Sequence, residues 1–282
     1  MFIDYFSLFN LSSDGIQRLV TLLNSTDSPL LLSTLSVLCN ISTNSEVRQA
    51  ISNVKENLPE MFSNLLKTTN DEIRSKTSIL IADICFIPSN QVHIQCDERR
   101  KWTLFIQEHF LHSDAVVGLS RMLSSPIEDV LVNACNAIDL LCRQNTLMQN
   151  ELAKHGIIEQ LTELLALDSS KKLFLLSDFH WFVFLFSFGT EILRGTVASA
   201  LASITYNNMI NQNLAASRGA LKLIVDLMQD REFGIRYKAA LAIEALSLNN
   251  VENQKQFLSK YLNVQKPLNE LLEVKRYDRT VV

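Results

Sequence analysis

Two histidine-containing pairs offer the side chains that a zinc ion binds. His93 and Cys96 are three positions apart, and so are His109 and His112, so each pair could supply two nitrogen or sulfur ligands. A structural zinc site needs four such ligands at finger-like spacings, and these spacings match no known finger. We therefore expect no metal here and interpret the stretch as an irregular loop.

A cysteine nucleophile is the other chemistry that the residue types allow. Cys142 and His155 could form a thiol–imidazole pair, but Cys142 falls in an apolar helical pattern and nothing identifies an acid that would orient the histidine. Acidic pairs such as Asp71 and Glu72 stand at expected helix starts, where they complement the helix dipole. The sequence has no Gly-rich phosphate loop, no Gly-x-Ser-x-Gly and no His-Glu-x-x-His. We expect no enzyme, no catalytic residue and no cofactor.

The composition favours helices and argues against a nucleic-acid partner. Of the 282 residues, 7 are Gly and 5 are Pro, too few for the many tight turns of a sheet-rich fold. The apolar fraction of 47% allows a substantial core. A net charge of −4 gives no basic footprint for a polyanion.

The cysteines and the start of the chain indicate an intracellular protein. Five cysteines occur at irregular spacings: Cys39, Cys85, Cys96, Cys135 and Cys142. Four of them fall in apolar helical patterns, which indicates small buried side chains in a reducing compartment. The apolar stretch from Met1 to Tyr5 has no basic region and no convincing cleavage site, so we do not expect it to be a signal peptide. We expect a cytoplasmic location.

The elements that would position any site recur along the chain. Each unit has a short helix ending in two large apolar residues, a polar break and then a longer helix. The interval is 43 positions from Leu23 to Leu66, 42 from Leu123 to Leu165 and 44 from Met228 to Leu272. These intervals indicate a unit of about 42 residues, as in helical-repeat proteins.

Two longer intervals indicate insertions. Leu66 to Leu123 is 57 positions and Leu165 to Met228 is 63, so we place insertions at 92–111 and 171–190. We expect one solenoid over residues 1–282, with units at 14–56, 57–91, 112–155, 156–218, 219–262 and a partial 263–282. The last unit stops before its long helix, so we also expect the chain to be a fragment.

The ends of the expected helices carry recognisable signals. Asp27, Asp71 and Asp114 stand just before helices and are expected to cap free N–H groups with their side chains. Gly156 and Gly219 follow short helices, where glycine permits the left-handed conformation that ends a helix. A pair of such helices cannot bury its apolar face alone, so we expect unit to stack on unit.

Three stretches resemble a known family: Asp14-Gly15-Ile16 with Leu19 and Leu22-Leu23, Leu35 with Leu38-Cys39-Asn40-Ile41, and His155-Gly156-Ile157-Ile158 with Leu161 and Leu164-Leu165. They resemble the armadillo repeat, a unit of three helices, and the likeness covers nearly all of the chain except the insertions. The resemblance implies an all-α fold, a right-handed α-solenoid of armadillo (ARM) repeats. It also implies a non-enzymatic scaffold that binds a protein partner along the concave surface formed by the third helices.

In peptide-binding members of the family, asparagine and tryptophan ladders on the third helices hold an extended partner. The positions of the asparagine ladder hold Asn40, Asp83, Leu140, Ser203 and Ala245 here. The positions of the tryptophan ladder hold Ser36, Ile79, Asn136, Ser199 and Leu241. Because only Asn40 matches, the resemblance does not imply recognition of nuclear-import signals.

Three residues are our candidates for a partner-binding groove: Asn40, Asp83 and Arg143. Arg143 is the main basic residue of the third helices, which weakens a catenin-like interpretation with a basic groove. We expect a protein partner of unknown identity, no nucleic acid, no membrane, and a monomeric stack.

The second insertion contains a densely aromatic stretch, residues 173–188. Sixteen residues of helix would span about 24 Å, which is shorter than the ~30 Å hydrocarbon core of a membrane. Three interpretations stay open: a non-native insertion such as translated intron, a helix or loop packed on the stack, and a contact with a partner or a membrane surface. The last gives an alternative function, a membrane-associated repeat protein that uses this segment.

Overall fold

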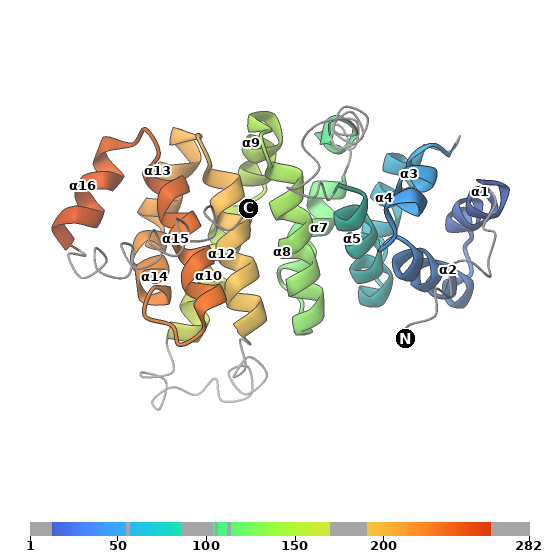
Figure 1. Ribbon diagram of the computed structural model, residues 1–282, viewed down its shortest axis with the longest axis horizontal. Helices are drawn as coiled ribbons and strands as arrows, with labels where there is room; N and C mark the ends of the chain where they lie inside the picture. The colour runs from blue at the N-terminus through green and yellow to red at the C-terminus, as the bar shows by residue number, and fades with distance from the viewer. Residues whose placement is uncertain are drawn as a thin grey trace, which may run out of the picture. The chain divides into compact units, whose positions relative to one another are not determined.

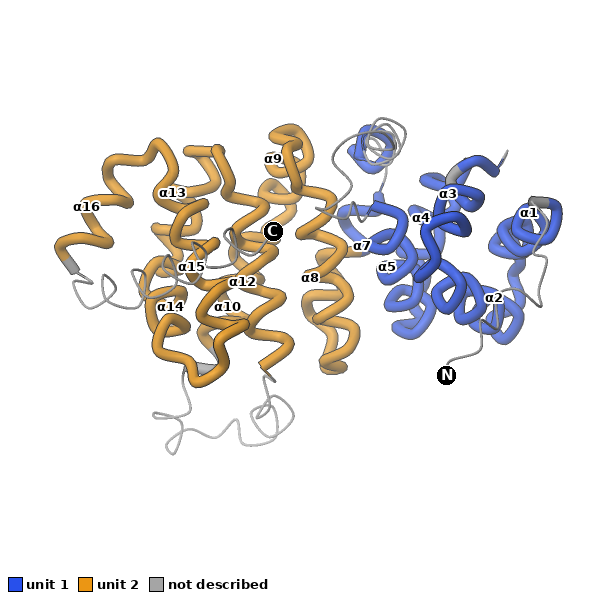
Figure 2. Tube along the Cα trace, in the orientation of Figure 1, with its two compact units in different colours: residues 1–118 blue, residues 119–282 orange. Residues whose placement is uncertain are grey.

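The computed structural model describes residues 13–54, 57–85, 104, 107–111, 114–169 and 191–260. Every regular element within these ranges is a helix (Figure 1). The chain divides into two compact units, Met1–Gly118 and Leu119–Val282 (Figure 2), and each is described by itself.

Unit 1 contains two long helices and the short helices that precede them. Its helices are α1 (Ser13–Thr21), the short 3-10 helix η2 (Leu22–Asn24), α2 (Ser28–Ile41), α3 (Ser45–Ser52), α4 (Leu58–Leu66) and α5 (Asp71–Cys85). Helix α7 (Ala115–Met122) begins in this unit and ends in the next. The long helices α2 and α5 pack against each other, while α4 packs on α5 and α1 on α3.

Unit 2 repeats the same order of helices more completely. It contains α8 (Glu128–Cys142), α9 (Thr146–Lys154), α10 (Ile157–Ser169), α12 (Glu191–Thr205), α13 (Met209–Ser217), α14 (Ala220–Leu227), α15 (Phe233–Ser247) and α16 (Val251–Lys260). The long helix α12 packs against both α8 and α15. A first, a second and a third helix therefore recur twice in succession, as α9–α10–α12 and α13–α14–α15.

Apolar residues at helical spacing form the core of each unit. In α2, Leu31, Leu35 and Leu38 recur every three or four positions and are at most 5% exposed. In α12, Val197 and Leu201 are buried in the same way. These two long helices therefore each bury an apolar face.

Two glycines end first helices in the left-handed conformation, as expected. Gly156 has φ 76° and follows α9, while Gly219 has φ 88° and follows α13. The N–H of Gly156 donates to the carbonyl of Ala153, and that of Gly219 to the carbonyl of Ala216, both at 3.0 Å.

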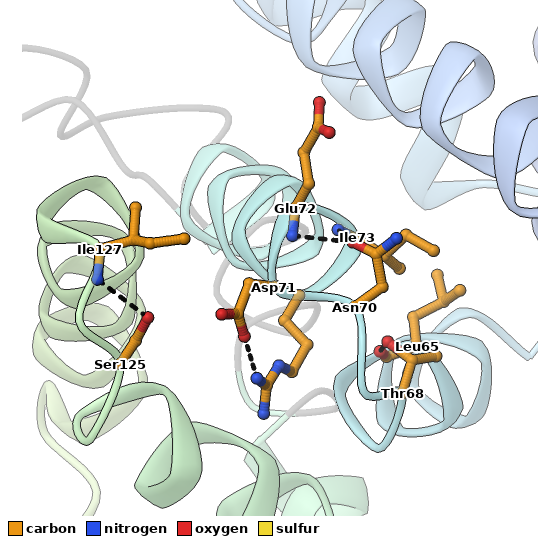
Figure 3. A network of polar contacts seen from close by, with 9 residues as sticks. Leu65, Thr68, Asn70, Asp71, Glu72, Ile73, Ser125 and Ile127 are labelled. Atoms are coloured by element: carbon orange, nitrogen blue, oxygen red, sulfur yellow. Dashed lines mark hydrogen bonds and ion pairs between the residues drawn. The ribbon is translucent and has the colours of Figure 1, made fainter.

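The capping expectation was wrong for Asp27 and for Asp71. The carboxylate of Asp27 makes no capping hydrogen bond. Asn70, not Asp71, caps α5: its Oδ1 accepts from the N–H groups of Glu72 at 2.9 Å and Ile73 at 3.2 Å (Figure 3). Asp71 is already the first helical residue, and a capping side chain must stand one residue earlier.

Asp114 and the turn before α8 use other contacts. The carboxylate of Asp114 lies 3.2 Å from Lys67 Nζ, an ion pair within unit 1. Before α8, the hydroxyl of Ser125 accepts a hydrogen bond from the N–H of Ile127 at 3.2 Å (Figure 3). In this turn a serine hydroxyl, and not a carboxylate, therefore bonds to the backbone N–H.

Part of the first insertion is helical. Residues 107–111 form helix, and Gln107 and Phe110 are fully buried. Burial of the large aromatic ring of Phe110 stabilises this helix relative to an exposed irregular loop. The remaining residues named for zinc, His93, Cys96 and His112, lie outside the described residues, as does the aromatic stretch 173–188.

Candidate partner-binding surface

The third helices of unit 2 present one continuous surface, because α12 lies against α8 and α15. We call it the third-helix face. It is defined by the half-buried or exposed residues Val132, Asn136, Ser199, Tyr237, Lys238 and Leu241. Two of the three asparagine-ladder positions in unit 2, Leu140 and Ala245, are buried, and the third, Ser203, is half-buried and bonds to Asp139. Its polar groups therefore come from other positions of the helices.

Asn40 lies near the end of α2 in unit 1 and is exposed. Its backbone carbonyl accepts a hydrogen bond from the Thr43 hydroxyl at 3.0 Å. Its side-chain amide bonds to no other residue in the part of the chain that the structure describes. The donor and acceptor of this amide are therefore both available to a partner.

Asp83 lies on α5, the third helix next to α2, and is half-buried. Its Oδ2 accepts a hydrogen bond from the Ser42 hydroxyl at 2.6 Å, which ties the end of α2 to α5. One carboxylate oxygen is thus engaged in joining two repeats. A partner would compete with this bond or use the other oxygen.

Arg143 follows α8 in unit 2 and forms an ion pair with Asp139 at 2.8 Å. The arginine side chain is 51% exposed and the aspartate 14%. Asp139 also accepts a hydrogen bond from the hydroxyl of Ser203 on α12. The arginine is therefore held against its own unit, although half of its side chain is exposed.

A row of buried amides joins consecutive repeats of unit 2, and sequence analysis missed it. Asn208 caps α13 and donates to Gln149 Oε1 at 3.1 Å and to Asn150 Oδ1 at 2.8 Å. Gln149 Nε2 in turn donates to the carbonyls of Ser203 at 2.8 Å and Tyr206 at 3.2 Å. A first helix therefore holds the end of the third helix that follows it.

The same bonds recur one repeat later. Asn250 donates to Gln212 Oε1 at 3.1 Å and to Asn213 Oδ1 at 2.8 Å. Gln212 Nε2 donates to the carbonyls of Ala245 at 2.8 Å and Leu248 at 3.0 Å. We call this set the amide ladder: Gln149, Asn208, Asn211, Gln212, Asn250 and Asn253. All six are at most 5% exposed, so the ladder stabilises the stack and offers nothing to a partner.

The cysteines that the structure describes are unreactive by environment. Cys85, Cys135 and Cys142 are buried. Burial, followed by the charge of Asp139, raises the pKa of the Cys142 thiol well above its ordinary value. Burial likewise raises the pKa of Cys39 to about 11, with Asp83 adding to the rise. A thiol that stays protonated at neutral pH is a poor nucleophile, which argues against the pair Cys142 and His155.

Neither a metal cluster nor a membrane-spanning helix is found in the described ranges. No group of three or more His, Cys, Asp or Glu side chains there is placed to hold a metal ion. None of the helices described is long and apolar enough to cross a membrane.

Comparison with solved structures identifies the fold. A designed armadillo repeat protein, YIII(Dq)4CqI, superimposes with a TM-score of 0.65 at 21% identity, over 92% of this chain and 98% of that one. A second, solved in complex with the peptide (KR)4, gives a TM-score of 0.62 at 20% identity with the same coverage. A third, designed for modular peptide recognition, gives 0.61 at 21% identity, again over 92% and 98%.

Sequence comparison adds nothing to this likeness. A scan against models of protein families and a search of curated protein sequences both find no match. The structural neighbours nevertheless agree with one another and with the succession of helices in each unit. The chain has the all-α solenoid fold of armadillo repeats.

Proposed function

We propose that this chain is a non-enzymatic scaffold that binds an extended segment of a protein partner along its third helices, the concave side of an armadillo stack. The observation that carries the proposal is the third-helix face, where half-buried polar groups on adjacent helices bond to no other residue that the structure describes. Designed proteins of the same fold recognise peptides, and one was solved with (KR)4 bound. Their identity to this chain is too low to transfer a ligand, so we transfer only the mode of binding.

The side chains of the third helices support this proposal in unit 1 as well. Asn40 is exposed with an unused amide, and extended peptides are commonly held by side chains that bond to their backbone. We retain Asn40, Asp83 and Arg143 as partner-binding candidates, with Asn40 first because the other two are engaged within the fold.

A narrower kinship is also part of the proposal. The stretches 37–43, 129–133, 154–157 and 254–258 resemble the armadillo portion of ankyrin and armadillo repeat-containing protein. The alternative, a membrane-associated protein using residues 173–188, rests on a segment outside the described residues.

Peptide display on the whole chain, followed by two matched variants, tests the function. We expect Asn40→Ala to weaken the selected peptides about fivefold, because a lost hydrogen bond to a partner costs roughly 1 kcal/mol. Asn64→Ala is the control: Asn64 is also exposed in unit 1 but lies on the second helix α4. Affinity is measured by fluorescence anisotropy and folding by the unfolding midpoint.

The two variants separate binding from folding. Equal weakening by Asn40→Ala and Asn64→Ala would place the peptide elsewhere. A fall in the unfolding midpoint that accounts for the lost affinity would remove Asn40 as a binding residue.

A further inference from the structure

Gly195 occupies an unusual place on the third-helix face. It lies inside α12, where glycine costs about 1 kcal/mol relative to alanine, so its presence needs a reason. The equivalent residues of the neighbouring third helices are Val132 on α8 and Tyr237 on α15. A Cβ at Gly195 would stand 3.1 Å from Lys238 Cδ and 3.3 Å from Lys238 Nζ. The missing side chain therefore lets Lys238 lie flat across α12.

The ammonium group of Lys238 has no counter-ion among the residues that the structure describes. Lysine normally extends its charge into water, whereas this half-buried side chain is held against a neighbouring helix. It takes part in no ion pair or hydrogen bond of the described residues. The other cation nearby, Arg194, is already paired with Asp230 at 3.1 Å. Within the described ranges, no acidic side chain is therefore paired with the positive charge of Lys238.

Two neutral polar side chains occupy the next turn of the neighbouring third helices. Ser199 follows Gly195 by one turn on the same side of α12, and Asn136 is its equivalent on α8. Both are half-buried, and neither bonds within the part of the chain that the structure describes. A hydroxyl and an amide can each donate a hydrogen bond, and beside an ammonium group they match the oxygens of a carboxylate.

We propose that Lys238, Ser199 and Asn136 form a receiving site for an aspartate or glutamate side chain in an extended partner peptide. The inference rests on the proposed function and adds the sign of the partner's charge at this point. Charge complementarity selects an acidic peptide, the opposite of the (KR)4 that one designed protein of this fold holds. Gly195 acts as a positioning residue, because it sets where the ammonium group lies.

Three labelled octapeptides, alternating alanine with Glu, Gln or Lys, probe the site on the full chain by fluorescence anisotropy. The wild type should bind the Glu peptide about tenfold more tightly than the Gln peptide, the scale of one charge-assisted hydrogen bond. Lys238→Gln should abolish that preference. The control Lys222→Gln removes the same charge from α14, where Lys222 is exposed, and should keep it. Gly195→Ala should reduce the preference with the charge intact, because Lys238 must shift to admit the new Cβ.

Several outcomes overturn the inference. It fails if the wild type binds the Glu and Gln peptides equally or prefers the Lys peptide. It also fails if Lys222→Gln reduces the preference for the Glu peptide as much as Lys238→Gln does, since the effect of the charge would then be long-range. Unfolding midpoints of all variants confirm that each is folded. If displayed peptides depend on the third helices but ignore Lys238→Gln, this inference falls while the proposed function stands; if none depends on those helices, the proposed function falls as well.

Discussion

The conformation of single residues decides where the short helices of this chain end. Gly219 has φ 88°, and a Cβ built there would meet no atom within 4 Å. The requirement for glycine is therefore one of backbone conformation and not of space. Gly234 also has open space around a Cβ, but it lies inside α15 with an ordinary φ. The substitution of glycine by alanine can therefore be compared at a left-handed position, Gly219, and at a helical position, Gly234.

Alanine at these two positions should change stability in opposite directions. Gly219→Ala should lower the free energy of unfolding by about 1 kcal/mol, because a side chain disfavours the left-handed region. Gly234→Ala should raise it by about 0.5 kcal/mol, because alanine favours helix. Urea denaturation of both variants measures the effects. The same sign of change in both would contradict a conformational role for Gly219.

At the scale of elements, hydrogen bonds between helices join one repeat to the next. Asn211 Nδ2 donates to the carbonyl of Gln149 at 3.1 Å and to that of Ile204 at 2.9 Å, so it connects two first helices and one third helix. In unit 1 the equivalent of Gln149 is Arg48, whose Nη1 donates to the carbonyls of Ser42 and Thr43 at 2.8 and 3.0 Å. Arg48 thus holds the end of the preceding third helix, as Gln149 does through the carbonyl of Cys142 at 3.3 Å, but Gln149 also holds the third helix that follows it.

The same substitution at two capping asparagines isolates the amide ladder. Asn208→Asp keeps the capping oxygen but loses the donor to Gln149 and Asn150, and it places a carboxylate against their oxygens. We expect a loss of about 2–3 kcal/mol in the free energy of unfolding. Asn44→Asp is the control, because Asn44 also caps a first helix but bonds only to Glu46 N and Val47 N.

The control should change stability by less than ~0.5 kcal/mol, because aspartate and asparagine cap about equally well. Chemical denaturation at neutral pH compares the variants. Equal losses in the two would show that capping, and not the inter-repeat bonds, is the main contribution of Asn208.

The sequence predicted the helices better than the contacts between them. The glycines of the turns and the apolar faces follow from local rules, and both were confirmed. The amide ladder depends on which helix ends meet across repeats, which no local rule shows. A signal was nevertheless present: Asn208 and Asn211 recur 42 positions later as Asn250 and Asn253. A period in polar residues, and not only in leucines, would have revealed it.

The candidate site was predictable only in part. The sequence analysis placed the candidate site on the third helices, and Asn40 is exposed on one of them. Lys238 was missed because its position depends on Gly195, 43 residues earlier in the chain. Asp83 and Arg143 were chosen by type and position, but their partners Ser42 and Asp139 became visible only with the helices packed.

At the scale of the whole molecule, the repeats account for the fold. Whether the fold also requires the insertions is a separate question. In unit 2, α12 is held by α8 and α15 and by Gln149, which bonds to the carbonyls of Ser203 and Tyr206. None of these contacts involves the second insertion. The other second helix of the unit, α14, reaches its third helix through the short loop Gln229–Glu232.

Replacing residues 171–190 with the loop sequence Gln229–Glu232 should therefore leave the unfolding midpoint of the chain unchanged. A marked fall in the midpoint would show that the insertion packs on the stack, the second of the three interpretations left open. Membrane fractionation of the same variant tests the third: if the wild type sediments with membranes and the variant does not, the alternative function gains over the scaffold. If the variant has the same unfolding midpoint and the same membrane fractionation as the wild type, neither the fold nor membrane association requires the segment. Sequencing the transcript across residues 171–190 then shows directly whether the segment is native, since an intron read as coding sequence by mistake would be absent from the mature message.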